Sequence, residues 1–293
     1  MRILITGSNG LLGQKIVAQC LNRGHVFLAT SKGENRNPDC PENVYKSMDI
    51  CREEEIRHVF NVFNPTHVIH TAALTNVDYC ELNPEECNEV NVRAVDKLWT
   101  ACKERNIHFQ LLSTDFVFDG EQGDYVETDP VGPLSVYAQS KVDAEQILQK
   151  DKVSNWSVVR TIIVYGDGNN LSRSNIILWA KEALNEGNEL SIVDDQFRAP
   201  TWADDLAWAC LEICRREKKG IFHISGPETM SIFNIVERIA KHFGLSTENI
   251  KRSSSINLNQ PAKRPPKTGF DLTKARKELG YDPKVLEATL DLL

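Results

Sequence analysis

A tyrosine and a lysine stand four residues apart in the segment LSVYAQSKVDAE, at Tyr137 and Lys141. The surrounding residues favour a helix, on which side chains four residues apart share one face, about 6 Å apart. An ordinary tyrosine has a pKa of about 10, and a nearby lysine cation favours the tyrosinate and lowers that pKa. The two side chains could therefore form the proton donor of a carbonyl reduction, but the same spacing also describes a surface pair with no function.

Small polar residues follow a predicted strand, Phe109–Ser113, that ends in LLSTDFVFDG. The carboxyl end of such a strand faces the ligand cleft in an open α/β sheet, which places Thr114 and Asp115 there. A ketone oxygen gains negative charge as hydride arrives, so it needs a proton donor and hydrogen bonds that strengthen with that charge. In this set Tyr137 is the general acid, Lys141 tunes it and holds the cofactor ribose, and Thr114 donates a hydrogen bond to the carbonyl oxygen.

A glycine-rich turn, TGSNGLLG, connects the first apolar run to a helix. Gly7 permits the tight turn, Gly10 lets the backbone approach a pyrophosphate, and Gly13 lets the helix pack close to the sheet. The helix N-terminus adds unpaired N–H groups and the positive end of the helix dipole. The alternative is a tight turn without a ligand. We predict a dinucleotide site formed by Gly7, Asn9, Gly10, Leu11, Leu12 and Gly13.

The end of the second predicted strand, Val26–Ala29, bears on the choice of cofactor. An enzyme that prefers NAD usually has an acidic residue there to bind the ribose 2′-hydroxyl. This chain has Ser31 and Lys32 instead, which can bind a 2′-phosphate by a hydrogen bond and by charge. The residues therefore favour NADPH over NADH, unless Lys32 is only a solvated loop charge.

Strands that alternate with helices must position these residues. Such alternation predicts βαβ units, and strands that are apolar throughout predict a parallel sheet buried on both faces. The fold class is therefore α/β, a Rossmann-type doubly wound parallel sheet with a smaller mixed α/β C-terminal substrate-binding lobe. We expect residues 1–165 to form the cofactor domain and 166–293 mainly the lobe, with about 202–224 returning to the Rossmann domain. The main predicted elements are strands Arg2–Thr6, His67–His70 and Val158–Tyr165, a short strand within Asn43–Met48, and helices Leu11–Arg23, Glu53–Phe63, Pro84–Arg105 and Tyr137–Lys150.

The composition of the 293 residues is that of an ordinary globular protein, with 41% hydrophobic residues and a net charge of −7. The negative charge argues against nucleic acid as a main partner. We expect no membrane span, because no apolar run approaches about 20 residues. The eight cysteines are scattered without a C-x-x-C pair, which favours reduced thiols and a cytoplasmic location. We expect no metal site.

The motifs together resemble the extended short-chain dehydrogenases/reductases, and within them the dTDP-4-dehydrorhamnose reductase family. The resemblance covers almost the whole chain and is carried by TGSNGLLG, HTAALTNVDYCE, LSTDFVFDG, PLSVYAQSK, DDQFRAPTWADDLA and RPPKTGFDLTKARKELGY. It implies that NADPH reduces the 4-keto group of a dTDP-linked deoxyhexulose, with Thr114, Tyr137 and Lys141 as the catalytic set.

The resemblance also implies further ligand contacts. Asp49 and Ile50 stand where the superfamily has residues that meet the adenine, and the segment Thr71, Ala72 and Ala73 stands where the chain lies along the cofactor ribose. The implied or candidate substrate contacts are Val77, Asp115, Phe116, Ile163, Arg198 and Arg264. For Arg264 we weigh a contact with the substrate diphosphate against a place in a surface basic patch.

Three positions depart from the family pattern. Ile163 replaces a tryptophan that packs on the sugar, Arg198 replaces a glycine, and Ala138 replaces the glycine after the catalytic tyrosine. An arginine at position 198 can meet a phosphate or a carboxylate, or close the pocket. These changes leave the hydride chemistry intact and leave the identity of the sugar open.

Two other functions remain open. The regulatory β subunit of methionine adenosyltransferase resembles these reductases and binds NADP, so a binding protein without turnover is one alternative. A reductase or epimerase that acts on another nucleotide sugar is the second. A sugar dehydratase is less favoured, because Asp115 lacks the adjacent glutamate of the Asp-Glu pair. We expect a homodimer only because dimers are common in the superfamily.

Overall fold

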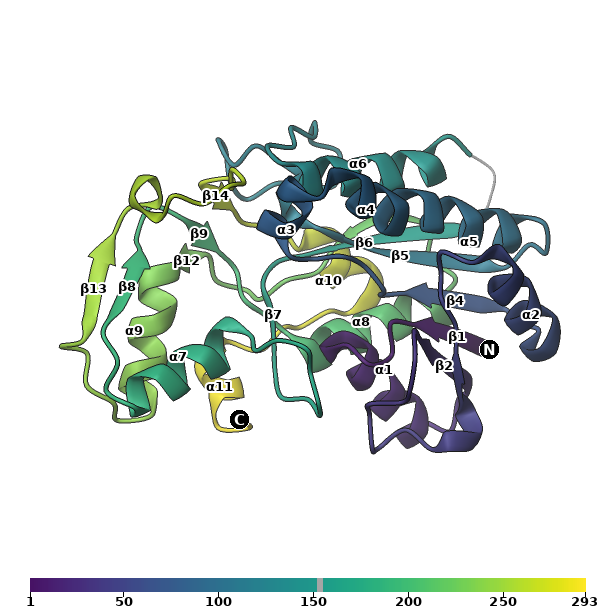
Figure 1. The fold of residues 1–293 in the computed structure, drawn as a ribbon, viewed down its shortest axis with the longest axis horizontal. Helices are drawn as coiled ribbons and strands as arrows, with labels where there is room; N and C mark the ends of the chain where they lie inside the picture. The colour runs from purple at the N-terminus through teal and green to yellow at the C-terminus, as the bar shows by residue number, and fades with distance from the viewer. Residues whose placement is uncertain (152–154) are drawn as a thin grey trace.

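The computed structural model describes residues 1–151 and 155–293 of the chain. A seven-stranded parallel sheet forms the larger part, on the right of Figure 1, and a smaller mixed part lies on the left. The strand order is β11-β6-β5-β4-β1-β2-β3. The strands are β1 (Arg2–Thr6), β2 (Val26–Ser31), β3 (Tyr45–Ser47), β4 (His67–His70), β5 (His108–Thr114), β6 (Trp156–Thr161) and β11 (Gly220–His223).

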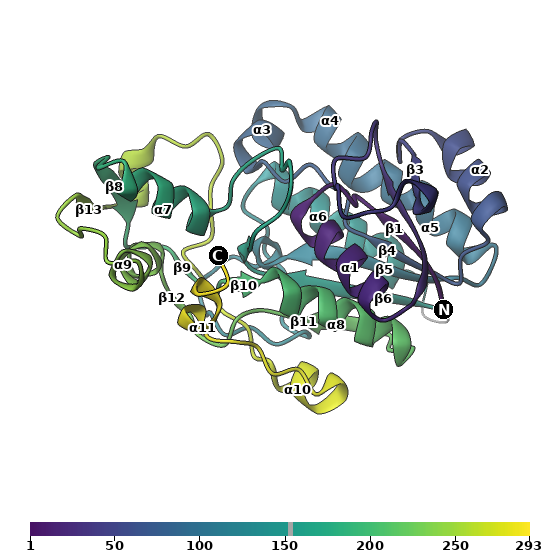
Figure 2. The ribbon, with the colours of Figure 1, turned by 90° about the horizontal axis from the view of Figure 1, so that it is seen from below.

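Helices cover both faces of the sheet, which confirms the predicted doubly wound architecture. On one face α1 and α8 pack side by side against the strands, as Figure 2 shows from below. On the other face a second core joins the strands to the remaining large helices. The helices concerned are α1 (Leu11–Asn22), α8 (Ala203–Arg215) and α10 (Thr273–Leu279) on the first face, and α2 (Glu53–Phe63), α5 (Ala94–Lys103) and α6 (Val136–Gln149) on the second.

The predicted helix Pro84–Arg105 is not a single α-helix. It consists of α4 (Pro84–Asn88), a π-helical turn (Glu89–Arg93) and then α5. The turn carries the buried Asn91, whose amide donates to the Leu74 carbonyl at 2.9 Å and to the Ser140 hydroxyl at 3.1 Å. These contacts tie the segment after β4 to α6, and π-turns of this kind often occur at functional sites.

The predicted strand Val158–Tyr165 is also interrupted. β6 ends at Thr161, and a two-residue strand, β7 (Val164–Tyr165), pairs instead with β10 (Thr201–Trp202). Between them Ile163 has φ +28°, a value rare for a β-branched residue, so the chain turns out of the large sheet there.

The smaller part is assembled from the end of the chain and the segment after β7. Two parallel strands, β8 and β13, pack with helices α7 and α9 around a separate core. A three-stranded sheet, β12-β9-β14, lies between this core and the large sheet (Figure 1). The elements are α7 (Ile176–Asn185), β8 (Leu190–Val193), β9 (Phe197–Arg198), β12 (Met230–Ser231), α9 (Ile232–His242), β13 (Ile250–Ser253), β14 (Lys267–Thr268) and α11 (Leu286–Leu290).

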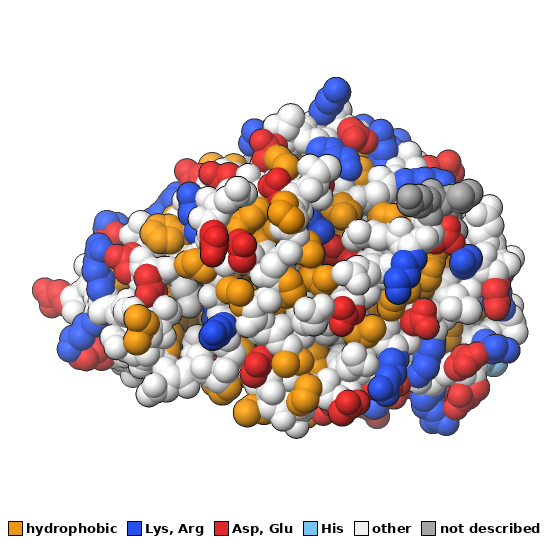
Figure 3. Space-filling model, turned by 90° about the horizontal axis from the view of Figure 1, so that it is seen from above, with side chains coloured by type: hydrophobic (Ala, Val, Ile, Leu, Met, Phe, Trp, Pro, Cys, Tyr) orange, Lys and Arg blue, Asp and Glu red, His pale blue; other side chains and the backbone are white. Residues whose placement is uncertain are grey.

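The face that α3 (Val77–Leu82), α4 and α6 present is shown in Figure 3, where hydrophobic side chains lie among charged ones. Exposed hydrophobic residues of this region include Tyr79 and Leu82 on α3 and Leu134 ahead of α6. Across the described ranges, 1–151 and 155–293, no helix combines the length and apolarity that crossing a membrane requires.

Candidate active site

The glycine turn has the geometry of an anion-binding helix start. The N–H of Gly10 donates to the Gly7 carbonyl at 2.9 Å, and α1 begins at Leu11 without a side-chain cap. Gly7 has φ +73°, and a Cβ at Gly13 would lie 2.4 Å from the Gly7 carbonyl oxygen. The backbone N–H groups of the first helical turn, which includes Leu12, are therefore available to a phosphate.

The loop after β2 folds against this turn through Asn9. The Asn9 N–H donates to the Ser31 hydroxyl at 3.0 Å, and the Asn9 amide donates to the Glu34 carbonyl at 2.8 Å. The Arg36 N–H in turn donates to the Asn9 side-chain oxygen at 2.9 Å. Asn9 thus holds the region predicted to bind the 2′-phosphate close to the region predicted to bind the pyrophosphate.

The remaining cofactor candidates lie along the same edge of the sheet. Lys32 is exposed and pairs with the carboxylate of Asp49 at 2.9 Å. Partial burial acts to raise the pKa of Asp49, but hydrogen bonds from the Cys51 N–H and from Lys32 lower it overall. Ile50 is buried in the core that joins the sheet to α2, α5 and α6. The Thr71 hydroxyl donates to the Thr6 carbonyl at 2.7 Å. The next two residues, Ala72 and Ala73, follow β4 past Gly7, with the Ala72 nitrogen 2.6 Å from the place of a Gly7 Cβ.

The three proposed catalytic residues meet at the carboxyl end of β5. Thr114 is the last residue of β5, and Tyr137 and Lys141 lie on successive turns of α6. Burial raises the pKa of Tyr137, while a hydrogen bond with the Thr114 side chain lowers it. Burial lowers the pKa of Lys141 to about 8, against the opposing charge of Glu145. The structure therefore differs from the prediction of a lowered tyrosine pKa, because removal from water outweighs the neighbouring charges.

Beneath this set lies a buried ion pair that the sequence reasoning missed. Glu145 pairs with Arg160 of β6 at 2.7 Å, and both side chains are almost fully buried. The Ser113 hydroxyl donates to the same carboxylate at 2.5 Å. The signal was the position of Glu145, four residues after Lys141 and hence on the same helix face. Asn91, in contrast, has no signal in the sequence, because a π-turn has none.

Two of the substrate candidates belong to the small apolar cluster that contains Tyr137. Val77 and Phe116 pack with Tyr137 in one small cluster, and the Phe116 ring meets the Tyr137 ring edge-on at 6.2 Å between centroids. Ile163 is half-buried where the chain leaves β6, and its carbonyl accepts from the Thr201 N–H at 3.0 Å.

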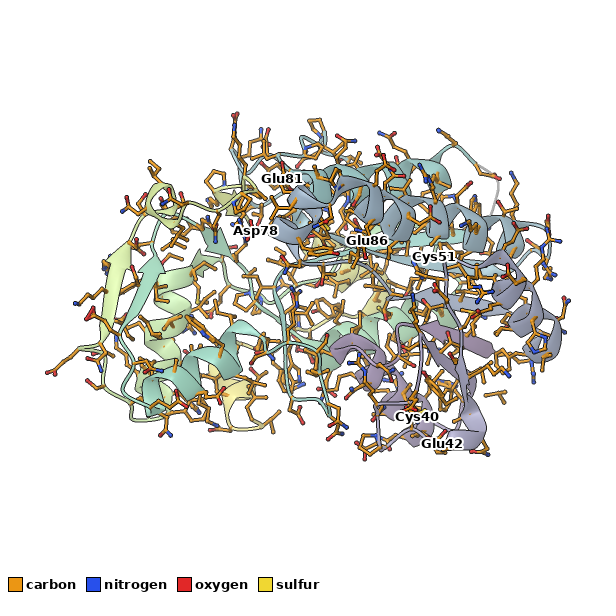
Figure 4. All side chains as sticks on the ribbon, viewed as in Figure 1. Cys40, Glu42, Cys51, Asp78, Glu81 and Glu86 are labelled. Atoms are coloured by element: carbon orange, nitrogen blue, oxygen red, sulfur yellow. The ribbon has the colours of Figure 1, made fainter. Side chains whose placement is uncertain are left out.

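The three charged candidates pair with one another or with a neighbour. Asp115 and Arg198 are both buried and approach to 3.5 Å, so Arg198 meets a carboxylate of its own chain. Arg264 pairs with Asp78 at 2.7 Å. Asp78 is labelled in Figure 4, on α3 at the side that faces the smaller part. In this structure neither arginine therefore presents an unpaired charge to a diphosphate.

The described residues contain no group of three or more His, Cys, Asp or Glu side chains placed to hold a metal ion. Asp78 and Asp115 are instead engaged in the pairs described above.

Comparisons with known proteins agree on one family. The model of the RmlD substrate binding domain matches residues 1–292. The Haloferax volcanii protein named "Probable low-salt glycan biosynthesis reductase Agl14" is 31% identical over 295 residues, which cover 100% of this chain and 97% of that protein. The β subunit of methionine adenosyltransferase 2 from Danio rerio is 29% identical over 271 residues, which cover 90% of this chain and 80% of that protein.

Among solved structures, a dTDP-4-dehydrorhamnose reductase from Clostridium acetobutylicum superposes with a TM-score of 0.87 at 27% identity, covering 100% of this chain and 98% of that one. The fold, the family match and these relatives agree with one another. The chain therefore belongs to the RmlD family of extended short-chain dehydrogenases/reductases, which are NAD(P)-dependent oxidoreductases.

Proposed function

We propose that the protein is an NADPH-dependent reductase of the 4-keto group of a nucleotide-linked deoxysugar, with the dTDP-linked 6-deoxy sugar as the first candidate substrate. The main support is that Thr114, Tyr137 and Lys141 meet at the same edge of the sheet as the glycine turn. The bound nicotinamide would supply the hydride to the carbonyl carbon. Tyr137 would give its hydroxyl proton to the carbonyl oxygen, and the Lys141 cation would stabilise the tyrosinate that remains.

The choice of NADPH rests on the end of β2. Ser31 and the exposed ammonium of Lys32 stand where an acidic residue would favour NAD, and Lys32 can exchange Asp49 for a 2′-phosphate. Asn9 holds the loop that carries both residues against the glycine turn.

The substrate contacts form the second part of the proposal. Val77 and Phe116 would flank the sugar, because both pack in the cluster that contains Tyr137. Arg264 would reach the diphosphate by leaving Asp78, since an exchange of a carboxylate for a phosphate conserves the charge pairing. We also propose the division at residue 165, with the segment of α8 and β11 counted in the cofactor domain because β11 pairs with β6.

The test is NADPH oxidation with a panel of nucleotide-linked 4-keto sugars, beginning with the dTDP-linked 6-deoxy compound. Turnover that Tyr137→Phe abolishes while NADPH binding persists is the expected result. Absence of oxidation across the panel, with NADPH bound, would overturn the reductase proposal.

A second function is favoured by one observation, the similarity to the methionine adenosyltransferase β subunit over 90% of this chain. Under this alternative the protein would bind NADP and act through a partner protein. A stable complex with a partner, together with no oxidation by the wild-type protein, would favour it. Light scattering in the same experiment would test the expected homodimer, for which α3 with Tyr79 and Leu82 offers an exposed apolar surface.

A further inference from the structure

A buried ion pair joins the smaller part of the molecule to the carboxyl end of β5. Arg198 lies on β9, and Asp115 directly follows the last residue of β5. Their side chains are 2% and 4% exposed, and Arg198 Nε lies 3.5 Å from an Asp115 oxygen. Three other N–H groups of Arg198 donate to the carbonyls of Pro265, at 2.7 Å, and of Pro266 and Phe197. Most of the hydrogen-bonding capacity of this arginine is therefore used within the chain.

The pair acts on the active site through Thr114. The Thr114 hydroxyl donates its single proton to Asp115 at 2.9 Å and accepts from the Phe116 N–H at 3.2 Å. Its remaining lone pair can accept from the Tyr137 hydroxyl, and the Thr114 side chain acts to lower the pKa of Tyr137. Thr268 of β14 also donates to the Asp115 carboxylate. Asp115 thus determines which way the Thr114 hydroxyl points.

A second contact reaches Tyr137 by another route. The guanidinium carbon of Arg198 lies 5.3 Å from the centre of the Phe116 ring, within the range of a cation–π contact. The Phe116 ring also packs edge-on against the Tyr137 ring. Arg198 therefore touches two neighbours of Tyr137 without touching Tyr137 itself.

We propose that Arg198 is a positioning residue for the reduction: it holds the Asp115 carboxyl group in place, so that Asp115 orients the Thr114 hydroxyl beside Tyr137. This inference rests on the proposed reductase function.

The charges around Asp115 determine the expected pH dependence. Arg198 faces it from β9 and Tyr137 from α6, and the charge of Arg264 acts on Arg198. Burial raises the pKa of Asp115, and Arg198 opposes that rise. Without Arg198 the buried carboxyl takes up a proton at higher pH, and a protonated Asp115 no longer accepts from Thr114 in the same way.

The experiment compares Arg198→Gln with Arg198→Lys over a range of pH. We expect Arg198→Gln to lower kcat at pH 7 at least tenfold, toward the roughly hundredfold loss seen when one transition-state hydrogen-bond donor is removed. Activity should recover as pH rises and Asp115 ionises. Arg198→Lys keeps a cation and should retain the wild-type pH profile. An unchanged kcat in Arg198→Gln, or a loss that is equal at every pH, would overturn the proposal.

Controls separate positioning from folding. Arg238→Gln breaks a more exposed ion pair, with Glu287 in the smaller part, and should leave the pH profile unchanged. If Arg198→Gln does not fold, Asp115→Asn in the presence of Arg198 serves instead. A kcat at least tenfold lower supports the proposal, and an unchanged kcat overturns it. Because both residues act on the same hydroxyl, adding Arg198→Gln to Asp115→Asn should lower kcat little further.

The carboxyl infrared band of Asp115 gives a readout without turnover. Arg198→Gln should show a protonated carboxyl at pH 7 that disappears in the double variant with Asp115→Asn, and its absence would overturn the inference. If wild-type protein reduces no keto sugar, the proposed function fails, while this band still decides whether Arg198 controls Asp115.

Discussion

Replacing Gly10 with alanine should weaken NADPH binding without weakening the fold. Gly10 has φ −81° and ψ 164°, which alanine adopts without strain. An added Cβ would lie 3.3 Å from the Gly7 carbonyl oxygen, so the backbone needs to give by only a few tenths of an ångström. We expect the free energy of unfolding to change by less than about 1 kcal/mol, partly because alanine restricts the unfolded chain.

The effect on NADPH affinity follows from the N–H groups that the turn presents to a pyrophosphate. A methyl group at Gly10 keeps a pyrophosphate away from the N–H groups at the start of α1, so one charge-assisted hydrogen bond is lost or lengthened. Such a bond contributes about 1.5–3 kcal/mol, which corresponds to a rise in Kd of about tenfold to 150-fold. Calorimetric titration with NADPH, paired with urea unfolding, measures both quantities on the same protein.

Gly24→Ala is the matched control. Gly24 has φ +64° and nothing within 4 Å of its added Cβ, so alanine there should cost about 1–2 kcal/mol of stability through backbone strain alone. It ends the turn after α1, away from the carboxyl edge of the sheet, and should leave the Kd unchanged. An unaltered NADPH Kd in Gly10→Ala would show that the pyrophosphate does not approach this turn and would refute the cofactor assignment.

Three further predictions concern the proposed chemistry. Tyr137→Phe should keep the NADPH Kd and lower kcat about 10²- to 10⁴-fold, the range of a lost general acid; stopped-flow oxidation of NADPH checks this, and unchanged turnover would exclude Tyr137 as the acid. Replacing Ser31 with Asp and Lys32 with Ala together should change the ratio of NADPH to NADH affinity about a hundredfold, because two contacts to the 2′-phosphate are lost; an unaltered ratio would remove both from the cofactor site. Lys141 has a folded pKa of about 8 against 10.5 for the ordinary side chain. The folded protein binds fewer protons between these values, so the penalty for burying Lys141 is complete below pH 8 and falls by about 3 kcal/mol as pH rises to 10.5. Urea unfolding of the wild type and of Lys141→Met at pH 7 and pH 10 measures this burial penalty. If the free energies of unfolding of the two proteins changed with pH in parallel, the prediction would be contradicted.

Local patterns were sufficient to predict the fold class and the way in which the proposed site is assembled. Alternating strands and helices predicted the doubly wound sheet, and the parallel topology then required the residues after β1, β2, β4 and β5 to share one edge. The spacing of Tyr137 and Lys141 and of the three glycines refers to a single helix and a single turn, and such short-range geometry can be read from neighbouring residues.

Features that depend on contacts between distant segments could not be predicted in this way. The break at Ile163 arises because β7 pairs with β10, some forty residues further along the chain, and the π-turn arises where Asn91 reaches Leu74 and Ser140.

The charged side chains show the same division most clearly. The sequence by itself determined that Asp115 follows a strand that ends at the predicted site, and the family resemblance made Arg198 a substrate candidate. Only the tertiary structure decided that they neutralise each other, because a buried charge takes whichever opposite charge the fold brings within reach. The raised pKa of Tyr137 has the same origin: exclusion of water depends on the packing of the whole molecule and not on the residue four positions away.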